Sequence, residues 1–97
     1  MAGNTPYTPP DAIVRELQDM ALGGGDVPAL LRCVQRFFGK KDCKILSVMC
    51  FHEAFHSGIA SISAVAGWSG FGGELSDEQV NDFVIPVLED FRNARPR

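Results

Sequence analysis

The sequence has few cysteines and no long, uninterrupted apolar run. Its three cysteines, Cys33, Cys43 and Cys50, are an odd number without CxxC spacing, whereas a secreted disulfide scaffold carries an even and denser set. The most apolar stretch, residues 43–68, is interrupted by charged and imidazole side chains such as Lys44, which disfavours a membrane span. We therefore expect buried, reduced thiols and no membrane contact.

An apolar signal sequence is missing from the first ten residues, which are polar and contain prolines. Together with the thiols, this predicts a cytoplasmic protein. An excess of positive charge is missing too, because the net charge is −3 over 97 residues, and this disfavours nucleic-acid binding. The composition, 45% hydrophobic and 22% charged, excludes wholesale disorder. The length corresponds to one domain, and we expect a lead-in at residues 1–8 and a single helical domain at 9–95.

The period-two alternation of β-hairpins is absent, and apolar residues recur at helical spacing instead. The pattern predicts helices at about residues 9–22, 26–39 and 42–66, and a fourth from residue 76 onward. We therefore expect an all-α fold, a compact bundle of about four helices.

Capping residues mark the predicted helix ends. Asp26 is a good N-cap and Gly39 a good terminator for the second helix. Ser76 and Gln79 have the spacing of a capping box at the start of the fourth helix. Pro86 falls inside the apolar stripe of that helix and predicts a kink there, because proline removes one backbone hydrogen bond.

The long third helix is predicted to carry two different faces. One is large and apolar: Ile45, Val48, Met49, Phe55, Ile59, Ile62 and Val65. The other is small: Cys43, Ser47, Cys50, Ala54, Ser57, Gly58 and Ser61. Small side chains let another helix approach closely, so this helix is predicted to be central in the bundle or to lie at a dimer interface.

A glycine-rich loop at residues 67–75 contains two large aromatic side chains, Trp68 and Phe71. One interpretation is that both rings tuck back onto the core. The other is that they form an exposed patch that binds a partner.

Charged residues are segregated along the chain. Arg32, Arg36, Lys40, Lys41 and Lys44 form a basic stretch broken only by Asp42. Glu74, Asp77, Glu78, Asp82, Glu89 and Asp90 form an acidic stretch. These residues are either solvated helix faces or a dipolar surface that pairs with a partner or with a second copy.

The string H-E-x-x-H occurs at residues 52–56, with histidines at His52 and His56 and the glutamate at Glu53. On a helix, residues four apart share a face, so both imidazoles could reach one zinc ion. The segment looks like the zinc-binding helix of the zincin metalloproteases. That resemblance implies that His52 and His56 are zinc ligands and that Glu53 is the general base.

Zincins of the gluzincin branch take their third ligand from a glutamate in E-x-x-x-D on a later helix. Residues 78–82 fit that string, which by the resemblance makes Glu78 the third zinc ligand and Asp82 its supporting partner. The alternative interpretation treats His52 and His56 as ordinary helix residues beside the apolar stripe.

Three functional hypotheses follow. The leading one is a small, non-enzymatic helical protein that self-associates and needs no cofactor, and that binds another protein as an adaptor, inhibitor or regulatory subunit. Its candidate contact residues are Trp68, Phe71, Arg32, Arg36, Lys40 and Lys41. The second is a minimal zinc-dependent hydrolase, and the third is a phage- or plasmid-type inhibitor of a larger nucleic-acid-processing machine.

Overall fold

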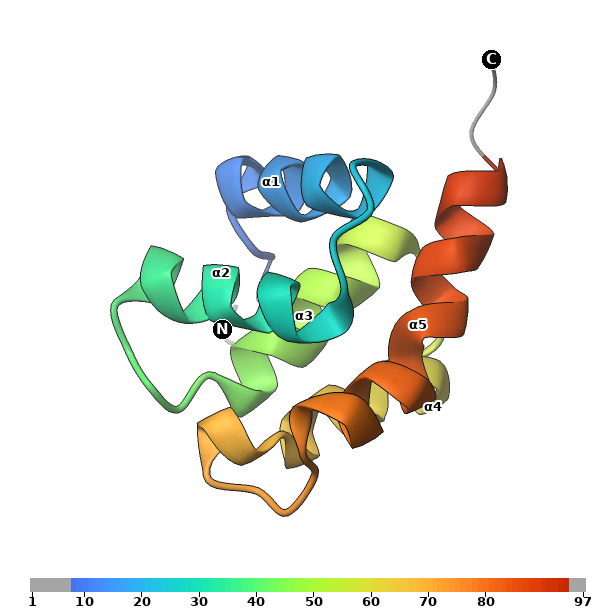
Figure 1. Ribbon diagram of the computed structural model, residues 1–97. Helices are drawn as coiled ribbons and strands as arrows, with labels where there is room; N and C mark the ends of the chain where they lie inside the picture. The colour runs from blue at the N-terminus through green and yellow to red at the C-terminus, as the bar shows by residue number, and fades with distance from the viewer. Residues whose placement is uncertain (1–7, 95–97) are drawn as a thin grey trace, which may run out of the picture.

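The computed structural model describes residues 8–94 and is built from helices (Figure 1). They are α1 (Asp11–Leu22), α2 (Val27–Phe38), α3 (Lys44–Phe55), the one-turn α4 (Ile59–Ile62) and α5 (Asp77–Ala94), with 3-10 turns at Ser63–Gly67 and Ser69–Phe71. Between residues 8 and 94 there is no strand, and a lone bridge joins Trp68 to Leu75. The predicted all-α fold is confirmed. Most of the predicted lead-in, residues 1–7, and the predicted domain end at residue 95 lie outside the described residues.

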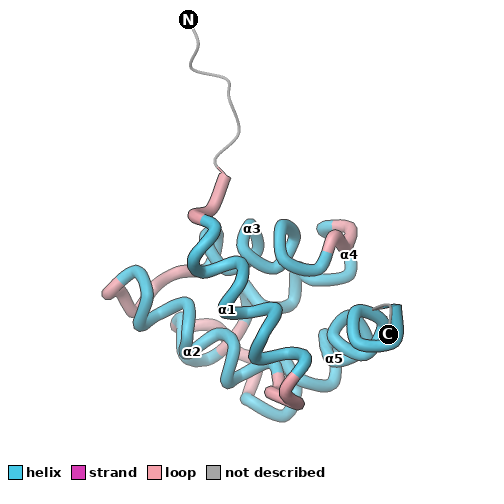
Figure 2. Tube along the Cα trace, turned by 90° about the horizontal axis from the view of Figure 1, so that it is seen from above, coloured by secondary structure: helices cyan, strands magenta, loops and turns pink. Residues whose placement is uncertain are grey.

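One core lies between the helices. Seen from above, α1 has α2 on one side and α3 on the other, while α5 runs along the edge of the molecule (Figure 2). The fully buried residues of α1 are Ile13, Leu17 and Ala21, four apart as the sequence pattern predicts. This packing places Asp77, at the start of α5, beside Arg32 of α2.

The predicted caps form as expected. The Asp26 carboxylate accepts a hydrogen bond from the backbone N–H of Ala29 at 3.1 Å, and α2 ends at Gly39 with a left-handed φ of 66°. Ser76 and Gln79 form a reciprocal capping box, in which the Gln79 side chain accepts from the Ser76 N–H at 2.9 Å and the Ser76 hydroxyl accepts from the Gln79 N–H at 3.2 Å. Local sequence chemistry therefore sets both helix ends.

The continuous helix predicted over residues 42–66 is wrong. The helix stops at Phe55, because His56 adopts a left-handed φ of 53° and Gly58 is extended. The chain then turns so sharply that α3 and the segment Ile59–Gly67 meet at 119°. Within residues 8–94, no single helix is both long and apolar enough to cross a membrane. In the same part of the chain, α3 and Ile59–Gly67 taken together are the one bent pair with sufficient length and apolar composition.

The sequence predicts that both faces of this helix are buried, and the structure buries the large apolar face only in part. Ile45, assigned to that face, is 69% exposed, whereas Phe55 is buried. Within α3 the small face is buried as predicted, with Ser47, Cys50 and Ala54 beside the fully buried Phe51. The reason is that α1 packs against α3, and small side chains allow that close approach.

The left-handed His56 gives a test of the helix break. We expect His56→Gly to raise the free energy of unfolding by about 0.5–1 kcal/mol, because glycine adopts positive φ without a Cβ penalty. Urea unfolding measures the change. His56→Ala is the matched control, since it removes the imidazole and keeps the backbone penalty. A glycine variant no more stable than the alanine variant would contradict this account.

Pro86 lies inside α5, and the helix continues across it. The ribbon of α5 changes direction between its first and second halves (Figure 1). That Pro86 causes a kink stays a prediction.

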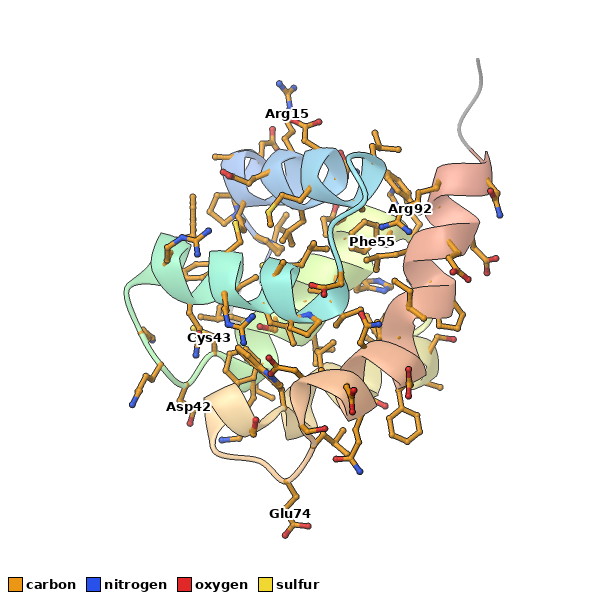
Figure 3. The ribbon with its side chains drawn as sticks, viewed as in Figure 1. Arg15, Asp42, Cys43, Phe55, Glu74 and Arg92 are labelled. Carbon is orange, nitrogen blue, oxygen red and sulfur yellow. The ribbon has the colours of Figure 1, made fainter. Side chains whose placement is uncertain are left out.

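Residues of α5 also satisfy backbone groups at the corner between α1 and α2. Arg92 reaches from α5 toward the end of α1 (Figure 3). Its Nε donates to the carbonyl of Ala21 and its Nη2 donates to the carbonyl of Gly25 at 2.8 Å. The Asn81 side chain accepts from the first N–H of α2, on Val27, at 2.9 Å. These hydrogen bonds tie α5 to the corner between α1 and α2.

Candidate functional site

A basic hollow of about 460 Å³ lies at the C-terminal end of α2. Its lining residues are Arg32, Gln35, Arg36, Gly39, Lys40 and Lys41. All four basic residues proposed from the sequence as partner contacts therefore line one surface feature, which we call the basic hollow. No acidic residue is part of the lining.

The end of α2 explains how these residues come together. Arg32 and Arg36 are four residues apart on α2 and so share a face. The left-handed turn at Gly39 brings Lys40 and Lys41 back beside that face. Glycine suits this position because a Cβ disfavours positive φ.

Gln35 holds the turn in place from within the hollow. Its side-chain amide donates to the carbonyl of Lys41 at 2.8 Å and to the carbonyl of Gly70 at 3.0 Å. Its own backbone carbonyl accepts from the N–H groups of Gly39 and Lys40. Gln35 thus connects α2, the lysine pair and the glycine-rich loop, and gives the hollow a fixed frame.

The charge of the hollow is largely uncompensated. Asp42 interrupts the basic stretch in sequence, but its carboxylate pairs with Lys44 at 3.0 Å. That hydrogen bond holds the pKa of Asp42 below its usual range. Across residues 8–94, Arg36, Lys40 and Lys41 make no ion pair, and all three are exposed. The hollow can therefore attract an anionic group from solution.

The aromatic residues of the glycine-rich loop lie behind the hollow. Trp68 is 3% and Phe71 4% exposed, and their rings meet edge to face at 5.0 Å. The interpretation that they tuck onto the core is confirmed. The interpretation as an exposed aromatic patch is wrong, because the loop folds both rings inward.

Trp68 is nevertheless coupled to the hollow through Arg32. The indole Nε1 donates to Asp77 at 2.7 Å, and Arg32 both pairs with that carboxylate and lies 5.5 Å from the indole centroid. The hydrogen bonds from Trp68 and from Arg32 lower the pKa of Asp77, so the carboxylate is ionised at neutral pH. Trp68 is the only tryptophan and thus a natural reporter of this region.

The H-E-x-x-H string does not form a two-histidine face. His52 lies in the last turn of α3, whereas His56 follows the helix in its left-handed conformation. The Nδ1 atom of His52 lies 2.7 Å from the carbonyl oxygen of Ser57, so the turn itself occupies one ring nitrogen. His52, Glu53 and His56 are all exposed. Two histidines four residues apart share a face only where the helix continues through both of them. Here α3 ends at Phe55, between His52 and His56.

Glu78, the predicted third ligand, is distant from the histidines along α5. It lies in the first turn of that helix, whereas His56 borders a hollow with Asp90 and Phe91 near the other end. At 1.5 Å per residue, Glu78 and Phe91 are about 20 Å apart along a helix. In the described part of the chain, no group of three or more histidine, cysteine or acidic side chains could hold a metal ion.

All three cysteines are free and buried, as predicted. Burial, together with nearby Cys43 and Cys33, raises the pKa of the Cys50 thiol to about 12. Because the thiolate is the reactive form of cysteine, Cys50 is not suited to nucleophilic chemistry at neutral pH.

Two residues that matter for the hollow, Gln35 and Asp77, were not predicted from the sequence as site residues. The Gln35 side chain donates to the carbonyl of Lys41, beyond the end of α2, and to the carbonyl of Gly70, which is distant in sequence. No local sequence pattern indicates such contacts. Asp77 reads in sequence as an ordinary acidic residue in the first turn of a helix. No protein-family model, curated protein or solved structure matches this chain.

Proposed function

We propose that this protein acts by binding another protein, and that the basic hollow receives an acidic segment of that partner. The observation that carries the proposal is the gathering of Arg32, Arg36, Lys40 and Lys41 in one hollow without an acidic lining residue. Arginine and lysine donors recognise carboxylates, and such complementarity gives specificity and fast association. An adaptor, an inhibitor and a regulatory subunit all fit this mode of action.

The frame of the hollow supports a preformed binding surface. Gln35 fixes the lysine pair through the Lys41 carbonyl, and the Asp77 carboxylate holds Arg32. A partner then binds without first ordering the backbone of the turn, which reduces the entropic cost of association. A cytoplasmic location, as the sequence predicts, is part of the same proposal.

A labelled oligoglutamate peptide tests the proposal directly. We expect it to bind the protein at low salt, and we expect Arg36→Glu to weaken binding by about tenfold or more. Fluorescence anisotropy measures the affinity, and Trp68 emission reports whether the hollow is the site. Arg15→Glu is the matched control, because Arg15 is an exposed helical arginine on α1 that points away from the molecule (Figure 3).

Two outcomes would overturn the proposal. One is the same affinity for the wild type and for Arg36→Glu, which would place the peptide elsewhere. The other is tighter binding of single-stranded DNA than of oligoglutamate, which would make the hollow a phosphate-backbone site.

The zinc-hydrolase hypothesis gains no support from the positions of His52, His56 and Glu78, and we do not propose it. The inhibitor of a nucleic-acid-processing machine differs from our proposal only in the identity of the partner. That hypothesis stays a prediction.

A further inference from the structure

The most exposed large apolar side chain of the described residues lies beside the basic hollow. Ile45 is 69% exposed. It lines a second hollow that shares Lys40 with the basic hollow and also contains the Lys44–Asp42 ion pair. We call the basic hollow together with Ile45 the basic surface. An uncovered apolar side chain among cations is typical of a contact site, since exposed apolar groups gain free energy when a partner covers them.

Carboxylates lie along one side of α5. Glu78 and Asp82 are four residues apart, and Glu89 comes seven residues after Asp82, so the three share one side of an α-helix. All three are exposed and make no ion pair within residues 8–94. We call Glu78 and Asp82 the acidic surface.

The two surfaces adjoin each other across one ion pair. Arg32 lines the basic hollow and also a smaller hollow that contains Asp77 and Glu78. The Arg32–Asp77 pair therefore marks the boundary between a positive half and a negative half of one face. Such a face is complementary to itself. A two-fold axis near the boundary places each positive half against the negative half of the other copy.

We propose that a second copy of this chain occupies the basic surface, with the acidic surface of each copy docked against the basic surface of the other. This inference rests on the proposed function, because it names the acidic protein segment that the hollow receives. Exposed ion pairs contribute weakly and are screened by salt. The dimer is therefore weak and salt-sensitive, and coverage of Ile45 adds the apolar part of its stability.

Sedimentation velocity of the full chain across a concentration series tests this inference. We expect a dimer whose apparent dissociation constant rises about tenfold or more from low to high salt. Lys40→Glu combined with Lys41→Glu should give a monomer, and so should Glu78→Lys combined with Asp82→Lys. Mixing these two variants should restore a dimer that contains one copy of each, because both contacts then regain opposite charges. Circular dichroism checks that each variant is folded, and Arg15→Glu again serves as the control.

The outcomes separate this inference from the proposed function. A wild type that stays monomeric at low salt but binds oligoglutamate through the hollow overturns the dimer and leaves the proposed function intact. Dimers that resist both charge reversals, or variants that do not associate when mixed, overturn the assigned surfaces. A monomer that also fails to bind oligoglutamate overturns both proposals.

Discussion

Replacing Phe51 by alanine should lower the free energy of unfolding by about 3–5 kcal/mol, because it leaves a cavity in the core. The Phe51 side chain is fully buried on the face of α3 that meets the other helices, and its ring packs edge to face against Phe55 at 5.4 Å. A domain of this size has a total stability of about 5–15 kcal/mol. The variant should therefore unfold at a much lower urea concentration than the wild type.

Phe83→Ala is the matched control, because Phe83 is 62% exposed on α5. Its truncation should change the free energy of unfolding by no more than about 0.5 kcal/mol. If both variants lost the same free energy of unfolding, Phe51 would not occupy a buried position in the core.

Gly73→Ala should lower the free energy of unfolding by about 3 kcal/mol or more, because the added Cβ would overlap the backbone oxygen of Gly67. That oxygen already accepts the N–H of Leu75 at 2.8 Å, and the Gly73 N–H donates to Trp68 at 3.0 Å. Neither backbone segment can shift without breaking the turn that folds Trp68 inward. We expect unfolding at lower urea concentration and a red shift of the Trp68 emission.

Gly58→Ala provides the comparison for Gly73→Ala. A Cβ at Gly58 meets open space, and φ there is −62°. The substitution should be neutral or should stabilise the protein by up to about 1 kcal/mol, since alanine reduces the freedom of the unfolded chain. If the two alanine variants were equally stable, the close approach of Gly73 to Gly67 would be refuted.

The parts of the fold that the sequence predicted depend on local rules. Asp26, Gly39 and the pair Ser76–Gln79 act on backbone groups within a few residues of themselves, so spacing alone identifies them. The clustering of the basic residues was predictable in the same way, because Arg32 and Arg36 are one helical turn apart.

The parts that the sequence did not predict depend on tertiary contacts. The helix break occurs at His56, which adopts a left-handed φ of 53°. Beside it, the Nδ1 atom of His52 lies 2.7 Å from the carbonyl oxygen of Ser57. The exposure of Ile45 was missed because apolar residues lie on several sides of α3, so periodicity could not show which of them the other helices would leave uncovered. The frame of the hollow was missed because Gln35 acts on Gly70, 35 residues away.

The Arg92 contacts have a consequence for how the chain folds during synthesis. Arg92 satisfies carbonyls that are 71 and 67 residues earlier in the chain, and Asn81 satisfies an N–H that is 54 residues earlier. The corner between α1 and α2 thus waits for partners that are synthesised more than 50 residues later. Pairings this distant must overcome a large loop-closure entropy before they contribute stability. The first two helices therefore become tied to each other through α5 only after α5 has been made.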